Sequence, residues 1–190
     1  MINLAVLGST RGTSIDNTFN EIVTGYLDAA VKVVISNKPD AFILQRAQNY
    51  SFEYVCIESK GKLCADFDRE LLLEIQKYPI DLIVLVGYMK ILSPEFVQAY
   101  AGKIINVHPS VLPKFAGGMD RDVHKKVIDA GEWESGCTVH LVDEGVDTGK
   151  ILLQKTCLLD DGETPESLKA KVQALESEAL LEVVKNWKII

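Results

Sequence analysis

The sequence predicts an α/β fold: a mainly parallel, twisted sheet with helices on both faces and an antiparallel addition in the C-terminal third. Before Pro109, short apolar segments typical of buried strands alternate with segments whose apolar residues recur at helical spacing. This alternation favours parallel strands joined by crossover helices, as in Rossmann-like folds. Downstream, two β-rich segments separated only by an acidic loop are expected to pair antiparallel.

The expected strands cover 2–7, 30–36, 52–57 and 80–86, followed by one ending near 105 and by the pair 138–142 and 151–159. The expected helices cover 15–27, 40–49 and 64–77, a short segment from Pro94, the charged stretch 122–129, and a long segment from Pro165 to about Val184. Ser93 and Thr164 are expected N-caps, because each hydroxyl precedes a proline suited to the first helical position. In such sheets ligands bind beyond the carboxyl ends of the strands, so we expect the site there.

Composition narrows the classes of protein that this chain can be. Its 190 residues are enough for one domain with a sizeable core, and we expect a single domain over 1–190. A net charge of −7 argues against a nucleic-acid partner, and no signal-like or membrane-spanning apolar run is present in the sequence. The four cysteines lack CxxC spacing, which favours reduced thiols and a cytoplasmic location.

The most informative segment is Asn106-Val107-His108-Pro109-Ser110-Val111-Leu112-Pro113, which follows the apolar pair at 104–105. Asn106 and His108 are two residues apart, so on an extended backbone both side chains point to the same side. An amide that stabilises an oxyanion beside an imidazole that moves a proton is suited to a reaction at a carbonyl. On the residues alone, a strand end whose polar side chains only cap the loop is an equally good interpretation.

A second segment, 136–149, favours the catalytic interpretation. An alternating β-branched strand there leads into an acidic loop that contains Asp147 and ends in glycine. Together with 36–41 and 87–93, the two segments resemble the folate-dependent formyltransferases over nearly the whole chain, and most closely those that formylate glycinamide ribonucleotide (GAR). The resemblance implies formyl transfer from the co-substrate 10-formyltetrahydrofolate to the GAR amine in purine synthesis.

The resemblance also implies roles for individual residues. Asn106, His108 and Asp147 match the catalytic set, in which the carboxylate near the imidazole would favour the charged imidazolium. The N-terminal half, about 1–100, is expected to bind the phosphate, and the half from about 101 to 190 to hold the catalytic and folate groups. The residues implied to contact the phosphate and ribose are Gly12, Thr13, Ser14, Gln173 and Glu176. Those implied to line the folate pocket are Met89, Lys90, Ile91, Leu92, Val97, Val142 and Glu144.

The remaining polar residues support simpler interpretations. His140 lies within an alternating strand and is expected to be a packed or hydrogen-bonded structural residue, whereas His124 is expected to be solvated. Since a metal site needs three or more converging ligands with suitable spacing, none is expected. Two segments depart from the family pattern. The 8–14 loop is about one residue longer and contains Arg11, and the 117–122 segment is expected to be a mobile loop near the folate entrance.

Several alternatives stay open from the sequence. A formyltetrahydrofolate hydrolase would carry an additional N-terminal domain, whereas the first strand is expected at Ile2. Formyltransferases acting on methionyl-tRNA or sugar nucleotides usually carry extra C-terminal sequence, and the acidity of this chain suits tRNA poorly. A nonenzymatic folate- or nucleotide-binding module is the alternative from another class of protein. Either a monomer or a homodimer is compatible with the sequence.

Overall fold

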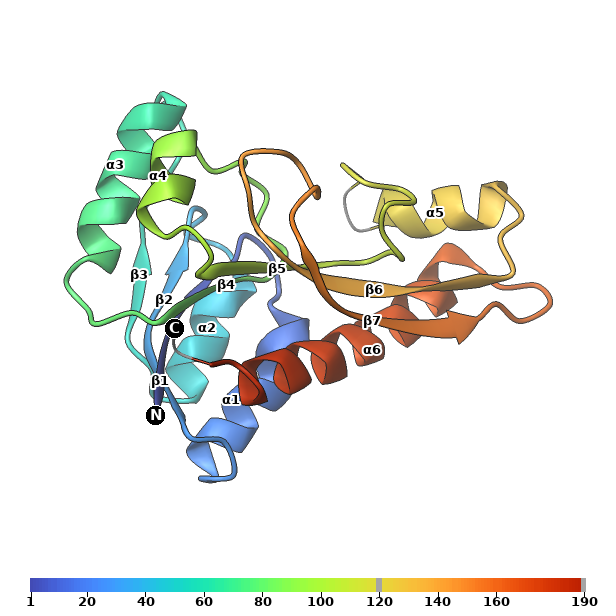
Figure 1. Cartoon of the computed structure of the whole chain (residues 1–190), viewed down its shortest axis with the longest axis horizontal. Coiled ribbons are helices and arrows are strands. Elements are labelled where there is room, and N and C mark those ends of the chain that lie inside the picture. The colour runs from blue at the N-terminus through green and yellow to red at the C-terminus, as the bar shows by residue number, and fades with distance from the viewer. Residues whose placement is uncertain (119–120, 189–190) are drawn as a thin grey trace.

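A seven-stranded sheet forms the centre of the computed structural model, which describes residues 1–118 and 121–188 (Figure 1). The strand order is β3-β2-β1-β4-β5-β6-β7. The first five strands along the chain pair in parallel, whereas β6 pairs antiparallel with β5 and β7 antiparallel with β6. The bounds of the strands are β1 Ile2–Leu7, β2 Ala29–Ser36, β3 Tyr54–Cys56, β4 Leu82–Leu85, β5 Ile104–His108, β6 Glu134–Leu141 and β7 Ile151–Leu158. The predicted fold class, with its antiparallel addition, is confirmed.

Helices cover both faces of the sheet, and two separate apolar cores result. Successive residues of β1 alternate between the cores: Leu4 and Val6 pack with α1, α2, α5 and α6, whereas Ala5 and Leu7 pack with α3 and α4. The bounds of the helices are η1 Thr13–Ile15, α1 Asp16–Val23, α2 Phe42–Asn49, α3 Cys64–Ile75, α4 Pro94–Ala99, α5 Arg121–Asp129 and α6 Pro165–Lys185. Burial on both faces explains why the central parallel strands β1, β4 and β5 are mostly apolar and do not alternate.

The two predicted N-caps are confirmed. Ser93 accepts a hydrogen bond from the backbone N–H of Phe96, with Pro94 in the first turn of α4. Thr164 and Ser167 form a capping box at the start of α6, so that both satisfy backbone N–H groups that the helix leaves without partners. α6 then runs alongside β6 and β7 and also packs against η1, which brings the last helix to the first loop of the chain (Figure 1).

The third strand is shorter than the predicted 52–57 segment. Phe52 instead packs edge-on against Phe19, with ring centroids 4.9 Å apart, and stacks on Tyr50 at 5.8 Å. Hydrophobic contact with the helices on one face therefore outweighs β-propensity at this position, and the edge strand begins only at Tyr54.

The order of the strands determines where a site can form. From β1 the chain proceeds to β2 and β3 on one side, and then returns to β4 on the other side. The loops that follow β1 and β4 therefore diverge over opposite faces and leave a crevice at the carboxyl end of the sheet. Within residues 1–118 and 121–188, no helix combines the length and apolarity that crossing a membrane requires.

Candidate active site

A cavity of about 230 Å³ lies beyond the carboxyl ends of β1, β4 and β5. Its walls come from the loop after β1, the segment after β4, the end of β5 with its following turn, the loop after β6, and α6. The described lining residues are Thr10 to Ser14, Leu85 to Leu92, Asn106 to Pro109, Gly117, Gly118, His124, His140, Val142, Asp143, Gly145 to Asp147, Lys169, Gln173 and Glu176. Segments far apart in sequence thus converge where the fold predicts a ligand.

The end of β5 delivers an amide and an imidazole into this cavity. Asn106 and His108 line it together with Val107, which also belongs, like Ile105, to the apolar core on one face of the sheet. Asn106 and His108, two residues apart on the strand, thus reach the same cavity, as predicted. Antiparallel pairing sets Asn106 directly opposite His140 of β6, which adds a second imidazole to the same wall.

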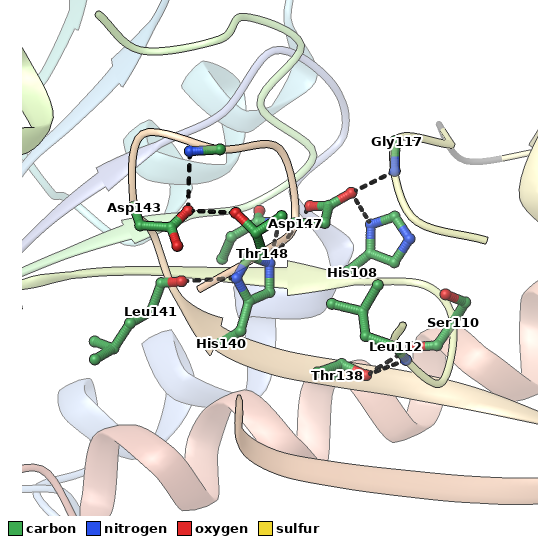
Figure 2. A network of polar contacts seen from close by, with 12 residues as sticks. His108, Ser110, Leu112, Gly117, Thr138, His140, Leu141, Asp143, Asp147 and Thr148 are labelled. Atoms are coloured by element: carbon green, nitrogen blue, oxygen red, sulfur yellow. Dashed lines mark hydrogen bonds and ion pairs between the residues drawn. The ribbon is translucent and has the colours of Figure 1, made fainter. Parts of the chain in front are cut away.

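His108 contacts an oxygen on both sides of its ring. Its Nδ1 lies 3.1 Å from Oδ2 of Asp147 (Figure 2). Its Nε2 lies 3.2 Å from the carbonyl oxygen of Phe115. Burial lowers the pKa of His108 below its ordinary value of 6.5 and outweighs the opposing effect of Asp147. Asp147 does favour the charged imidazolium, as expected, but burial is the larger effect on this pKa. Since both ring contacts are acceptors, however, the network accommodates a second proton on the ring.

The carboxylate of Asp147 is the centre of the polar network. Oδ2 accepts a hydrogen bond of 2.8 Å from the Gly117 N–H, and Oδ1 lies 3.5 Å from Nε2 of His140 (Figure 2). Burial raises the pKa of Asp147, but the hydrogen bonds from His140 and Gly117 and the proximity of His108 outweigh burial and leave this pKa below its ordinary value. Asp147 is therefore ionised near neutral pH.

His140 is a buried, hydrogen-bonded residue, as predicted, but it also belongs to the site. Its Nε2 lies 3.2 Å from the side-chain nitrogen of Asn106, and its Nδ1 lies 2.8 Å from the carbonyl oxygen of Leu141. The sequence places His140 only within an alternating strand. A signal that could have found it is its spacing from Val142: the two are two residues apart, and both line the cavity.

His124 differs from the sequence prediction. The side chain was expected to be solvated, but it is only 1% exposed and lines the cavity from α5. Val123 and Val127 of the same helix join the apolar core under α5, which turns this helix onto the sheet and buries its neighbour. The charged residues next to His124 in the sequence favoured the prediction of a solvated side chain, which is wrong.

The loop after β1 has the features of a phosphate-binding turn. Gly12 adopts a left-handed conformation, φ 62°, immediately before the 3₁₀ turn η1. A Cβ at Gly12 would lie 2.6 Å from Cγ1 of Ile43, so both the backbone angle and the available space require glycine. From η1, Ser14 donates a 2.5 Å hydrogen bond to Oε2 of Glu176 on α6. Gln173 lines the same part of the cavity, so the five residues implied for phosphate and ribose lie together.

The residues implied for folate divide into two groups. The members that line the cavity are Met89, Lys90, Ile91, Leu92 and Val142. Among the described residues, Val97 and Glu144 lie outside the lining. Val97 is buried in the core beside α3 and α4, and Glu144 accepts a 2.8 Å hydrogen bond from Gln98. The ammonium of Lys90 lies 4.8 Å from the centre of the Phe67 ring.

The loop that carries Asp147 is held by Asp143. Its Oδ1 accepts hydrogen bonds from the Gly145 N–H at 3.0 Å and from the Thr148 hydroxyl at 2.7 Å (Figure 2). Asp147 itself has a left-handed backbone, φ 56°, a conformation that aspartate tolerates better than most residues. Asp143 is exposed, and its side chain organises the turn that carries Asp147.

The turn after His108 is fixed by Thr138 of β6. The Thr138 hydroxyl accepts a hydrogen bond from the Leu112 N–H at 3.0 Å and donates one to the Ser110 carbonyl at 2.7 Å (Figure 2). It also accepts a hydrogen bond of 2.9 Å from the Gln154 amide. Part of the predicted mobile loop, residues 119–120, lies outside the described residues. Among the side chains that the structure describes, no group of three or more His, Cys, Asp or Glu residues is arranged to hold a metal ion.

A crevice at the switch point of a parallel sheet, with an amide, an imidazole and a carboxylate on one wall, defines an enzyme of the formyl transferase type. A family model described as Formyl transferase matches residues 2–184, and the chain belongs to this family. The resemblance drawn from the sequence motifs is confirmed.

Individual relatives cover nearly the whole chain. The phosphoribosylglycinamide formyltransferase of Escherichia coli (strain K12) is 36% identical over 187 residues, covering 98% of this chain and 86% of the relative. The enzyme of that name from Bacillus subtilis (strain 168) is 33% identical over 191 residues, covering 98% and 94%. The crystal structure of glycinamide ribonucleotide transformylase 1 from Symbiobacterium toebii superposes with a TM-score of 0.92, at 32% identity over 97% of this chain and 86% of that one.

Proposed function

We propose that this protein transfers the formyl group of 10-formyltetrahydrofolate to the amine of GAR, giving formyl-GAR and tetrahydrofolate in de novo purine biosynthesis. The observation that carries the proposal is the convergence of Asn106, His108 and Asp147 on the wall of a cavity that also includes a phosphate-binding turn. Membership of the formyl transferase family and similarity to phosphoribosylglycinamide formyltransferases over 98% of the chain support it.

In this proposal the two substrates enter from opposite ends of the cavity. The GAR phosphate binds the N–H groups of Gly12, Thr13 and Ser14 at the start of η1, because free N–H groups before a helical turn suit an anion. Gln173 and Glu176 of α6 contact the ribose. The folate lies against the segment 87–92 and the loop after Leu141, where apolar side chains and backbone groups line the cavity.

The chemistry that we propose is direct transfer. The GAR amine attacks the formyl carbon, and the developing negative charge on the formyl oxygen is stabilised by the Asn106 amide, and by His108 once its ring has taken up the amine proton. The C–N bond to N10 of the folate then breaks. The amine loses one proton and N10 gains one, so the reaction is balanced without any further reactant. Holding both substrates in one cavity supplies the proximity that a reaction between two molecules needs.

The pair formed by His108 and Asp147 is suited to carrying that proton. Burial keeps the His108 ring neutral in the free protein, so it can accept a proton as the amine attacks. The ionised Asp147 beside Nδ1 then stabilises the imidazolium that forms, and the ring can donate its proton to N10. With a neutral imidazole next to an ionised carboxylate, His108 can act first as a base and then as an acid.

The cellular setting is also part of the proposal. All four cysteines are free thiols, which suits a reducing compartment, and we propose the cytoplasm. We propose further that the chain acts as one catalytic domain, with phosphate recognition in the half before about residue 100 and the catalytic and folate groups after it. The reaction needs no metal, because the proton carriers and oxyanion donors are side chains.

A three-acceptor assay tests this function. Purified protein is mixed with 10-formyltetrahydrofolate alone, with GAR, or with glycinamide riboside, which has the same amine but no phosphate, and products are identified by mass spectrometry. We expect formyl-GAR with GAR, much slower product formation with the riboside, and no formate in the absence of an acceptor. Formate release without GAR would indicate a hydrolase, and folate binding without any product would indicate a binding module.

A further inference from the structure

The phosphate-binding turn is held in place from outside the cavity by α2. The backbone N–H of Ile43, in the first turn of α2, donates a 3.1 Å hydrogen bond to the carbonyl oxygen of Thr10. The Ile43 side chain fills the space next to both Gly8 and Gly12, where a Cβ would come within 2.5 and 2.6 Å of its atoms. The shape of the turn therefore depends on a helix that does not belong to its own β-strand–loop–helix unit.

Arg46, one turn further along α2, contacts the turn on both sides of Gly12. Its Nε donates a 3.3 Å hydrogen bond to the carbonyl oxygen of Arg11, and its Nη1 forms an ion pair with Asp16 at the start of α1. The Arg46 side chain is only 15% exposed, whereas Asp16 is 42% exposed, so the arginine is the more confined partner. One planar guanidinium thus joins the residue before Gly12 to the residue that follows η1.

The ring of Phe42 holds this guanidinium from one side. The Cζ atoms of Arg46 and Arg11 lie 6.0 and 5.7 Å from the centre of the Phe42 ring, within the range of cation–π contacts. Arg46 therefore has an aromatic contact, an ion pair and a backbone acceptor.

From these contacts we propose that Arg46 is a positioning residue for substrate phosphate. It holds the Arg11 peptide so that the following N–H groups, of Gly12 to Ser14, face the cavity. Its charge is already compensated by Asp16, and it lies outside the described lining of the cavity, so it acts through geometry and not as a direct phosphate ligand. The inference rests on the proposed function and deepens it, since it assigns a determinant of phosphate recognition.

Three substitutions separate this role from simple stabilisation. Arg46→Met removes both polar contacts. Arg46→Lys keeps a cation that can pair with Asp16 but lacks the planar fork that reaches two partners at once. Asp16→Asn removes the ion pair and leaves the bond to the Arg11 carbonyl.

Five quantities are measured for each variant. They are kcat, the KM for GAR, the KM for 10-formyltetrahydrofolate, the Ki of inorganic phosphate against GAR, and the melting temperature. Arg69→Met, which removes an arginine that is 66% exposed on α3, is the matched control.

We expect Arg46→Met to raise the KM for GAR and the Ki of phosphate by about tenfold, the order expected for a lost hydrogen bond to a charged group. Arg46→Lys should raise the KM for GAR and the Ki of phosphate by a smaller factor. Asp16→Asn should raise them by less than about threefold, and Arg69→Met should leave both unchanged. The folate KM and kcat at saturating GAR should be unchanged in all four.

Two results would overturn the inference. One is a wild-type Ki of phosphate in Arg46→Met and Arg46→Lys. The other is a fall in kcat together with a rise in both KM values, which would indicate a general loss of structure. If Arg46→Met does not fold, Arg46→Lys and Asp16→Asn still show whether the affinity for phosphate depends on the hydrogen bond to the Arg11 carbonyl or on the ion pair with Asp16. Failure of the proposed function itself is distinguishable, because the wild-type protein would then show no GAR-dependent product.

Discussion

The Nδ1 atom of His108 lies 3.1 Å from Oδ2 of Asp147, and this contact joins the end of β5 to the loop after β6. Both side chains are largely withdrawn from solvent, with 4% and 11% of their surfaces exposed. Burial lowers the pKa of the imidazole, while hydrogen bonds from His140 and Gly117 keep the pKa of the carboxylate low. A neutral base next to a fixed negative charge is the arrangement that the proposed proton transfer requires.

Replacing Asp147 by asparagine tests the pair directly. Asn has nearly the same shape but no charge, so it cannot stabilise the imidazolium, and kcat should fall by about 10²-fold or more. The KM for GAR should stay within about threefold of the wild-type value, since the phosphate turn is untouched. Steady-state kinetics with Asp161→Asn, on an exposed turn, as control would check this. A kcat near that of the wild type would exclude Asp147 from the proton path.

The stability of the protein should depend on pH through His108. Because its folded-state pKa lies below 6.5, the unfolded chain binds a proton first as the pH falls, so the free energy of unfolding should decrease from pH 6.5 down to that lowered pKa. Asp147 acts in a lower window: its pKa is below 3.8, and its contribution is lost only as the pH falls through that lowered value. Urea unfolding of wild type and His108→Gln over this pH range would separate the contributions of His108 and Asp147. The glutamine variant should lack the decrease in the free energy of unfolding below pH 6.5.

Asn106→Ala should reduce turnover by about 10²- to 10³-fold, the effect typical of losing one oxyanion donor. Asn106 also contacts His140 at 3.2 Å, so the variant should be compared with Asn20→Ala on the exposed face of α1. Single-turnover formation of formyl-GAR measures the chemical step apart from product release. Near-normal single-turnover rates in Asn106→Ala would contradict its assignment as the oxyanion donor.

The sequence predicted the fold class and the carboxyl-end location of the site because both depend on local patterns. Buried parallel strands are apolar throughout, and a proline after serine or threonine marks a helix start, so β1, β4, α4 and α6 were recognisable. The contact between β5 and β6 was not, because antiparallel register depends on packing and not on any short motif. The place of His140 opposite Asn106 was therefore missed.

Two other parts of the site required three-dimensional information. His124 lies among charged residues, and only the packing of Val123 and Val127 on the sheet buries it. Asp143 looks like one of several loop acids, and its role follows from bonds to a backbone N–H and a hydroxyl that no spacing rule indicates. Val97 was implied for folate by resemblance, but it packs from α4 into the core shared with α3.

The turn that follows His108 gives a prediction about stability. Thr138→Val keeps the size of the side chain but removes the acceptor of the buried Leu112 N–H and one of the two acceptors of the Gln154 amide, which should cost about 1–3 kcal/mol. Thr156→Val, at an exposed position of β7, is the matched control and should be nearly neutral. Urea unfolding followed by circular dichroism would measure both. Equal stabilities of the two variants would mean that the Thr138 hydroxyl does not hold the turn.

The phosphate turn can be tested with a pair of glycines. Gly12→Ala would place a Cβ 2.6 Å from Ile43 at a positive φ, whereas Gly25→Ala has a similar φ of +79° but nothing within 4 Å. Backbone strain should lower the free energy of unfolding of both variants by about 1–2 kcal/mol. Gly12→Ala should show a further loss from the clash with Ile43, and it alone should raise the KM for GAR. Thermal melting together with steady-state kinetics gives the comparison. A KM for GAR that is equal in the two variants would argue against phosphate binding at this turn.

The most direct test of the central claim is absorbance-monitored release of tetrahydrofolate from 10-formyltetrahydrofolate, with and without GAR, for wild type and His108→Ala. We predict release by the wild type only when GAR is present, and at least about a 10²-fold loss in His108→Ala. Release by the wild type without GAR, or a His108→Ala variant with nearly full GAR-dependent activity, would contradict the account.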